Sequence, residues 1–188
     1  MSEVKHLQTP LSEEVIAGLK TGDRVLLSGV VYTARDAAHK RLVTLIKEGK
    51  NLPFDIEGQI IYYVGPAPAP PGRPIGAAGP TTSSRMDPYA PILLAHGLKG
   101  MIGKGKRSRE VIEAIKRFKG IYFIAPGGAG ALLALCVRQA EVIAYPELGA
   151  EAVYKLVVKD LPLFVGNDIY GNDIYEIGKK EFQIASCP

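Results

Sequence analysis

The spacing of apolar residues changes along this chain, and each change marks a predicted strand or helix. Residues 24–32 are rich in β-branched side chains and predict a buried strand. From Asp36 to Glu48 the apolar positions recur every three or four residues, which predicts an amphipathic helix. A second such helix is expected to begin after Ser108, its N-cap, and to end near Phe118. Further strands are expected at residues 59–64, 100–102 and 121–125.

Toward both ends the pattern is less regular. Ser12 is the expected N-cap of a short first helix, and another helix is expected from Pro88 to about His96. Residues 129–137 are apolar on every side, which predicts a buried helix. Strands are expected at 142–144, 152–158 and 162–165, with an edge strand or hairpin at 171–175. Strands and helices alternate without a fixed-period repeat, so we expect one α/β domain with a mixed sheet over residues 1–188.

A segment rich in proline and glycine, residues 65–80, interrupts this pattern. Such a composition is typical of a linker between domains. Both flanks carry predicted structure, however, and the segment ends on a cluster of hydroxyl side chains, so an ordered functional loop is at least as good a prediction.

Composition and charge narrow the class of protein. Hydrophobic residues make up 47% of the 188 residues and charged residues 22%, as in a soluble globular protein. No apolar run approaches the length of a membrane span, and the N-terminus is polar, so we expect a cytoplasmic protein without membrane contact. The formal charge is +4, but the densest basic run, residues 104–109, has no aromatic side chain nearby. This favours a small anionic ligand over nucleic acid.

The cysteine count bears on possible cofactors. The chain has two cysteines. Cys136 lies in an apolar run and is expected to be a small buried thiol, whereas Cys187 is the penultimate residue and is expected to be exposed. Two thiols are too few for an iron–sulfur cluster, so any such cluster is expected on another chain.

The first segment with possible binding chemistry lies where the strand at 24–32 meets the following helix. Arg35 falls at this junction, where a guanidinium can grip a carboxylate and the helix amides add donors. Alternatively, Arg35 pairs with Asp36 or with another acid nearby. His39 is one helical turn after Arg35 and can share its face, or it is a hydrogen-bonded structural histidine.

The second segment combines four consecutive hydroxyl side chains, residues 81–84, with Arg85. Following a glycine- and proline-rich loop, this group resembles a cradle for a carboxylate, with Thr81, Thr82 and Arg85 as candidates. The alternative is that the hydroxyls cap the helix expected at Pro88 and that Arg85 lies on the surface.

The third segment is glycine-rich and contains Lys104. It is not a phosphate-binding P-loop, because the lysine is not followed by serine or threonine. The neighbouring glycines leave Lys104 open to a small anion. Another glycine-rich stretch, residues 126–130, lacks the dinucleotide-binding pattern and is explained by close packing of a helix. The three cations with no evident base or metal ligand therefore describe half of a site that receives a dicarboxylate.

Four segments occur in the order typical of the C-terminal region of class I (iron–sulfur) fumarases. They are Thr-Ala-Arg-Asp-Ala-Ala-His-Lys-Arg at 33–41, Tyr-Val-Gly-Pro at 63–66, Gly-Pro-Thr-Thr with Arg-Met-Asp at 79–87, and Met-Ile-Gly-Lys-Gly at 101–105. On these motifs the chain resembles that family from about Thr9 to Tyr175. In some organisms this region is a separate β subunit.

The resemblance implies a swivelling β/β/α-type domain and a partner, the fumarate hydratase α subunit. In the family, the partner carries a four-iron four-sulfur cluster that acts as a Lewis acid, and this chain would bind no cofactor or metal itself. The implied reaction is the reversible addition of water to fumarate, giving (S)-malate. An α₂β₂ heterotetramer is the implied assembly.

The resemblance also implies roles for individual residues. Arg35, Arg85 and Lys104 would bind the carboxylates of the substrate, with Thr82 as a neighbour. Thr81 matches the position proposed in the family for proton abstraction, although a threonine hydroxyl would need an acid–base partner from the α subunit. Asp36 and His39 would support Arg35.

Two alternatives remain. Tartrate dehydratases share this architecture, but the sequence after Lys104 and the tail at 171–173 are closer to the fumarase form. Mesaconate is a further possible substrate. A protein of another class, a non-enzymatic anion-binding module that lost its partner, would retain the fold without the reaction, and the intact set of cations argues against it.

Overall fold

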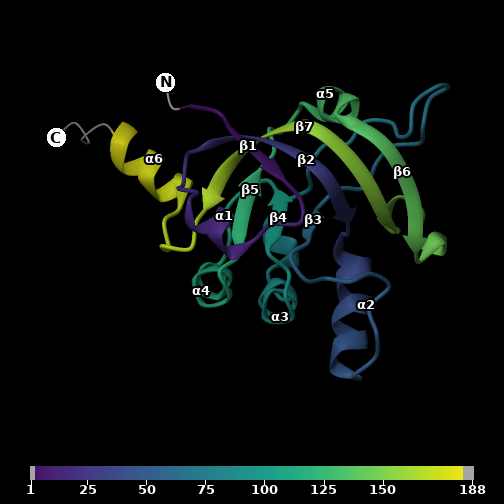
Figure 1. Cartoon of the computed structure of the whole chain (residues 1–188), viewed down its shortest axis with the longest axis horizontal. Coiled ribbons are helices and arrows are strands. Elements are labelled where there is room, and N and C mark those ends of the chain that lie inside the picture. The colour runs from purple at the N-terminus through teal and green to yellow at the C-terminus, as the bar shows by residue number, and fades with distance from the viewer. Residues whose placement is uncertain (1–2, 184–188) are drawn as a thin grey trace.

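The computed structural model describes residues 3–183, which form one mixed sheet covered by helices (Figure 1). The strand order is β1-β2-β3-β4-β5-β7-β6. The strands are β1 (Lys5–Gln8), β2 (Arg24–Thr33), β3 (Ile60–Tyr62), β4 (Gly100–Gly103), β5 (Ile121–Ile124), β6 (Val137–Ala144) and β7 (Val153–Asn167). The helices are α1 (Glu13–Ala17), α2 (Asp36–Lys47), α3 (Ala90–Ala95), α4 (Arg109–Phe118), α5 (Gly130–Leu135) and α6 (Ile174–Phe182), with short 3₁₀ turns η1 (Ser83–Met86) and η2 (Pro146–Glu151).

The sheet curls until it is partly closed. Strands β1 to β5 run parallel, whereas β7 pairs antiparallel with β5, β6 and β2. Because β7 touches both β5 and β2, the parallel strands are bent around a shared interior. This arrangement agrees with the expected α/β class and mixed sheet.

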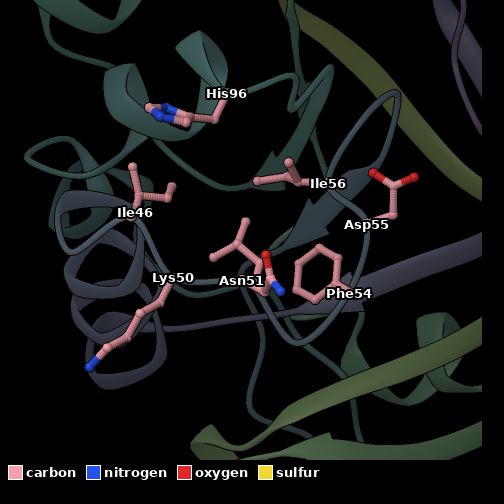
Figure 2. Close-up of a pocket in the computed structure, with 9 residues that line it drawn as sticks. Ile46, Lys50, Asn51, Phe54, Asp55, Ile56 and His96 are labelled. Carbon is pink, nitrogen blue, oxygen red and sulfur yellow. The ribbon is translucent and has the colours of Figure 1, made fainter.

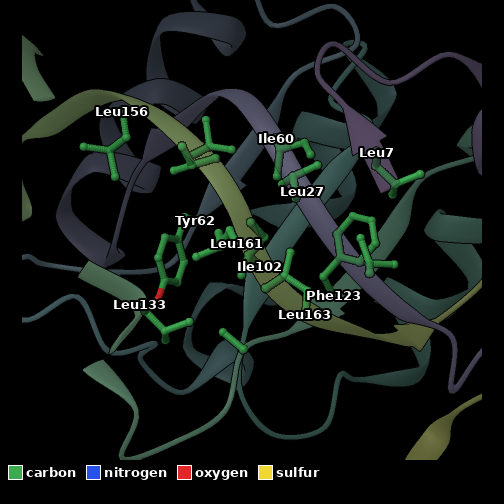
Figure 3. Close-up of a cluster of buried hydrophobic side chains, with 14 of the residues drawn as sticks. Leu7, Leu27, Ile60, Tyr62, Ile102, Phe123, Leu133, Leu156, Leu161 and Leu163 are labelled. Carbon is green, nitrogen blue, oxygen red and sulfur yellow. The ribbon is translucent and has the colours of Figure 1, made fainter. Parts of the chain in front are cut away.

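Strands β3, β4 and β5 are buried on both faces, which explains their nearly continuous apolar sequences. Alternate side chains point to opposite sides, so Tyr62 and Phe123 enter the core inside the curled sheet (Figure 3). Their chain neighbours Tyr63 and Tyr122 enter a second core on the outer face. That second core is covered by α2, α3 and α4, which lie together below the sheet in Figure 1.

Several expected elements are confirmed within about a residue or two at their ends. The strand expected at 24–32 is β2, and the helix expected from Asp36 to Glu48 is α2. Both predicted serine caps are present: the Oγ atoms of Ser12 and Ser108 accept hydrogen bonds from the backbone amides three residues later. Helix α3 is shorter than expected because the 3₁₀ turn η1 precedes it.

The prediction of a buried helix at 129–137 was wrong. Helix α5 is shorter, and the side chains of Leu132 and Leu135 are 66% and 49% exposed. Only one side of α5 meets the core, through Leu133 and Ala134. An apolar composition all around a helix therefore did not require burial here.

The strands expected at 152–158 and 162–165 are a single strand, β7. Asp160 breaks the apolar alternation and has a left-handed backbone with φ of 52°. Its amide donates to the Oγ of Ser28, where the register of β2 also shifts before Gly29. The irregularities of the two strands thus lie opposite one another, and the ladder continues past them.

The tail was expected to form a strand or hairpin at 171–175, but it leads into helix α6. Asp173 forms one isolated bridge with Asn167, and its carboxylate then caps α6 by accepting from the amide of Tyr175. Helix α6 projects away from the sheet at the left of Figure 1.

The proline-rich segment 65–80 is an ordered loop and not a linker. Ile75 and Ala78 are buried in the inner core. Ala67 and Ala77 are joined by a backbone hydrogen bond of 2.9 Å, and Ala78 donates to the carbonyl of Gly130 at 2.9 Å. The loop is therefore fixed to the start of α5, at the same side of the molecule as the ends of the parallel strands.

The expectations about the two cysteines and about membrane contact can be compared with the structure only in part. Cys136 is half-buried, which is less than expected, and Cys187 lies outside the described residues. Over residues 3–183, every helix is too short or too polar to cross a membrane.

Candidate anion-binding site

The segments singled out in the sequence meet at one edge of the sheet. Strands β2, β3, β4 and β5 run parallel, so their carboxyl ends lie along the same edge. Arg35 follows β2, Lys104 follows β4, and the Thr81 amide donates to the Tyr63 carbonyl directly after β3 at 2.7 Å. Open α/β sheets usually present ligand groups at this edge.

Arg35 lies at the N-terminus of α2, as expected from its junction position, but it is ion-paired. Its Nη2 lies 3.1 Å from Oε1 of Glu151, and the other carboxylate oxygen of Glu151 accepts from the Ala37 amide at 3.4 Å. Glu151 therefore occupies both kinds of donor, a guanidinium and a helix N-terminus, that a substrate carboxylate would use. Arg35 is therefore paired with an acid, but the acid is Glu151, which is distant in the sequence, and not Asp36 or another local acid as the alternative expected.

Asp36 connects Arg35 to the second candidate segment. The Nε atom of Arg85 donates to Oδ1 of Asp36 at 2.9 Å, and Asp36 directly follows Arg35 in the chain. Arg85 is about half exposed. Two further atoms here, Nε of Arg35 and Oδ2 of Asp36, are buried without a hydrogen-bond partner among the described residues. Buried polar atoms usually have partners, which a water or a ligand would supply.

His39 supports this group from beneath and does not face solvent. Its side chain is fully buried, and Nδ1 donates to the Arg35 carbonyl at 2.9 Å. Burial lowers the pKa of His39 to about 4, so the ring is neutral at pH 7. We call Arg35, Asp36, His39, Arg85 and Glu151 the arginine end of the site.

The lysine end of the site consists of Thr81, Thr82 and Lys104. The Lys104 amide donates to the Thr81 carbonyl at 3.3 Å, and the Lys104 carbonyl accepts from Ser83 at 2.9 Å. This pairing places the two threonines beside the lysine backbone. Thr81 is half-buried, whereas Thr82 and Lys104 are exposed. Among the described residues Lys104 has no ion pair, so it can meet an external anion.

A buried charge near Lys104, the guanidinium of Arg107, was not predicted from the sequence. Arg107 belongs to the basic run that was judged by its charge alone, yet its side chain is completely buried. Its Nε donates to Oδ1 of Asp87 at 2.7 Å, and its guanidinium carbon lies 5.3 Å and 5.0 Å from the ring centroids of Tyr63 and Tyr122. The only available signal was Asp87 itself, which lies within the family motif.

Ser83, within the hydroxyl cluster at 81–84, does not face a ligand as the cradle prediction would suggest. Ser83 is buried, and its Oγ lies 2.9 Å from the hydroxyl of Tyr122. That hydroxyl donates to the carbonyl of Gly105 at 2.8 Å. Ser83 therefore supports the site from below, and the hydroxyls that remain available to a ligand are those of its exposed neighbours.

A cavity of about 520 Å³ lies far from this edge (Figure 2). Its lining includes Ile46, in the last turn of α2, and Lys50, which follows that helix, together with His96 and Phe54. Arg35 precedes the other end of this 12-residue helix, which is about 18 Å long. None of the residues predicted for the site lines this cavity.

In the part of the chain that the structure describes, the side chains do not fit an iron–sulfur cluster or another multidentate metal site. Within residues 3–183 there is no group of three histidine, cysteine or acidic side chains that could hold a metal ion. Cys136, at the start of β6, has its Sγ beside the carbonyls of Leu132 and Asp160.

Residues 2–178 match the model of the fumarase C-terminus family, and the chain belongs to that family. The resemblance drawn from the four motifs is therefore confirmed.

The relatives of this chain include fumarate hydratases and a tartrate dehydratase subunit. The chain is 42% identical to the anaerobic class I fumarate hydratase of Escherichia coli K12, over 87% of this chain and 31% of that protein. It is 42% identical to fumarate hydratase 2 of Leishmania major, over 82% of this chain and 28% of that protein. It is also 37% identical to the putative L(+)-tartrate dehydratase subunit beta of Methanocaldococcus jannaschii, over 92% of each chain.

The lengths of these relatives differ in an informative way. The chain spans about a third of the fumarate hydratases that it matches, but nearly all of the tartrate dehydratase subunit. Both names denote hydro-lyases. The matched region is therefore only one part of the fumarate hydratases, and it is nearly the whole of the relative that is named as a subunit.

Proposed function

We propose that this chain is the β subunit of a two-subunit class I fumarate hydratase and supplies the cations that bind the carboxylates of fumarate and (S)-malate. One observation carries the proposal. Arg35, Arg85 and Lys104 come from separate parts of the chain and lie along the carboxyl edge of the sheet, with an ordered loop beside them. The family and the names of the relatives favour a hydro-lyase.

The chemical task of these cations follows from the reaction. Removing a proton next to a carboxylate builds negative charge on that carboxylate, and fixed cations stabilise the charge most in the transition state. Arg35 and Arg85 would hold one carboxylate and Lys104 the other. Each arginine already contacts an acid, so the substrate would share Arg35 with Glu151 or displace that carboxylate.

Thr81 is our candidate for proton transfer, with Thr82 as the neighbouring alternative. The Thr81 backbone is held on one side by Tyr63 and on the other by Lys104, which keeps its side chain at the edge. A threonine hydroxyl is too weak a base at neutral pH, so an acid–base group from the partner subunit would have to accept the proton.

The same reasoning assigns the cluster to the partner. The chain has only two cysteines, so a four-iron four-sulfur cluster would bind to the α subunit. When bound there, the cluster would supply Lewis-acid assistance to the departing hydroxyl group. An α₂β₂ assembly is the arrangement that we expect.

Anaerobic assays of fumarate hydration test this proposal. The chain alone should be inactive, and the chain combined with a cluster-loaded α subunit should consume fumarate and release (S)-malate. The complex carrying Lys104→Gln serves as the comparison, and it should hydrate fumarate more slowly because it lacks one of the proposed carboxylate-binding cations. Turnover by the isolated chain would contradict the proposal.

L(+)-tartrate dehydration is the second candidate, because a relative of that name matches this chain along almost its whole length. The same complex should be offered fumarate, mesaconate and L(+)-tartrate in parallel. A higher kcat/KM for tartrate would replace fumarate in the proposal. A complex that assembles, binds dicarboxylates and converts none of the three would indicate a binding module.

A further inference from the structure

We infer that Arg107, Asp87, Tyr122 and Ser83 form a buried clamp whose task is to hold Lys104 at a set position beside Thr81 and Thr82. None of the four would touch the substrate, so they are positioning residues. The inference deepens the proposed function, because it concerns the same site and rests on Lys104 binding a substrate carboxylate.

The first half of the clamp is the pair of Asp87 and Arg107. Oδ1 of Asp87 accepts from Nε of Arg107, and Oδ2 accepts from the Ser108 amide, both at 2.7 Å. One carboxylate therefore binds the turn between Lys104 and α4 at two points. Asp87 is two residues after Arg85, so the same pair also connects the segment of Arg85 to the segment of Lys104.

The second half of the clamp is the Tyr122 hydroxyl. It contacts Ser83 Oγ at 2.9 Å and donates to the Gly105 carbonyl at 2.8 Å. Ser83 is adjacent to Thr82, and Gly105 is adjacent to Lys104, so this one hydroxyl joins the neighbours of both ligand groups. The Gly105 amide is held as well, by the hydroxyl of Tyr175 at 3.0 Å.

The burial of Arg107 favours a positioning role over a purely stabilising one. Burying an ion pair costs desolvation energy that the pair only partly recovers, and apolar residues of similar size are often as stabilising. Here one end of the guanidinium, Nη2, is buried without a partner among the described residues. A pair of this kind is weak evidence for a stabilising role, whereas two rings and a carboxylate fix the position of the guanidinium.

The close contact at Gly103 shows how little freedom the clamp leaves. A Cβ atom placed on Gly103 would lie 2.0 Å from Ser83 Oγ and 2.8 Å from a ring carbon of Tyr63. The residue before Lys104 is therefore pressed against the segment that carries the threonines. The backbone of Lys104 is therefore held in place, even though its side chain is exposed.

The test uses Tyr122→Phe, which removes the bridging hydroxyl and keeps the ring. Tyr62→Phe is the matched control, because Tyr62 is a buried tyrosine that donates to a backbone carbonyl, that of Ala78, on the inner face of the sheet. Amide hydrogen exchange is measured on both variants. Tyr122→Phe should speed exchange of the Ser83 and Lys104 amides about tenfold, and Tyr62→Phe should leave them unchanged.

Steady-state kinetics of the assembled complex then test the consequence for the site. Tyr122→Phe should raise KM for fumarate about tenfold with a smaller change in kcat, because binding geometry is lost in a folded protein. Ser83→Ala breaks the same bridge from the other side and should give a similar shift. The double variant should be hardly worse than either single variant, since both remove one interaction.

The outcomes separate this inference from the proposed function. Faster exchange at Ser83 and Lys104 with an unchanged KM would overturn the positioning role, and so would unchanged exchange. If the wild-type complex does not convert fumarate, the proposed function fails. The exchange measurement would then still show whether the clamp holds the two segments together.

Discussion

The two ends of the candidate site are built in different ways. At the arginine end, orientation comes from side-chain charges: Glu151 holds Arg35 and Asp36 holds Arg85. At the lysine end, orientation comes from the main chain: Lys104 is paired through its backbone to Thr81 and Ser83, and its side chain has no ion pair among the described residues.

This difference suggests that the two ends bind a carboxylate in different ways. A guanidinium held by an acid is already oriented, but it must share its donors with that acid when a substrate arrives. An exposed ammonium has its full charge available, but it needs a rigid base to be in the right place. Charge substitutions should therefore act most strongly at the arginine end, and substitutions that move the backbone should act at the lysine end.

The largest effect is expected for Arg35→Met in the assembled complex. It removes a carboxylate-binding cation and leaves Glu151 without its partner, so kcat/KM for fumarate should fall about a hundredfold or more. Arg41→Met, which removes a half-exposed arginine from the middle of α2, is the matched control and should have little effect. Equal activity of the Arg35 and Arg41 variants would show that the arginine end does not bind substrate.

Gly103→Ala should damage the lysine end through the backbone. Because the added methyl group overlaps Ser83, the free energy of unfolding should fall by about 2 to 3 kcal/mol, as measured by chemical denaturation. Gly127→Ala is the control on the neighbouring strand end, where the nearest atom would be Lys104 Cδ at an ordinary 3.9 Å. A Gly103 variant as stable as the Gly127 variant would contradict the tight packing described here.

His39 should make the arginine end sensitive to acid. Its pKa of about 4 lies below the ordinary value, so between about pH 6.5 and 4 the unfolded chain binds a proton that the folded chain does not. This stabilising contribution is present above pH 6.5 and is lost as the pH falls, amounting to about 2 kcal/mol at pH 5. His39→Gln should lose correspondingly less stability between pH 7 and pH 5, and parallel denaturation curves would contradict this.

The smallest effect is expected for Glu151→Gln. The amide oxygen can still accept from Ala37, while the charge that competes for Arg35 is removed. If the substrate shares or displaces this carboxylate, KM for fumarate should fall by about twofold to threefold. An increase in KM would instead show that Glu151 is needed to orient Arg35, which would make the two ends more alike.

The sequence predicted local features well because they depend on neighbouring residues. The serine caps at Ser12 and Ser108, the amphipathic helix α2 and the strand β2 all follow from patterns within about ten residues. The three candidate cations were chosen on similarly local signals: Arg35 directly follows a strand, Lys104 lies among glycines, and Arg85 follows a run of hydroxyl side chains.

Features that depend on distant parts of the chain were not predictable in the same way. Glu151 meets Arg35 only because η2 packs on α2, and the sequence between them gives no indication of this. Arg107 was judged only as part of a basic run without aromatic residues nearby in the sequence, whereas the rings of Tyr63 and Tyr122 lie against it in the fold. The exposure of Leu132 depends on how little of α5 the sheet covers.

The central claim is that Lys104 binds a substrate carboxylate, and chemical labelling tests it most directly. An amine-reactive reagent is applied to the assembled, cluster-loaded enzyme with and without saturating fumarate, and the labelling of each lysine is followed by mass spectrometry. Fumarate should slow the labelling of Lys104 about tenfold while leaving Lys47, exposed at the far end of α2, unchanged. Equal labelling of Lys104 with and without fumarate, in an enzyme that turns over, would contradict the claim.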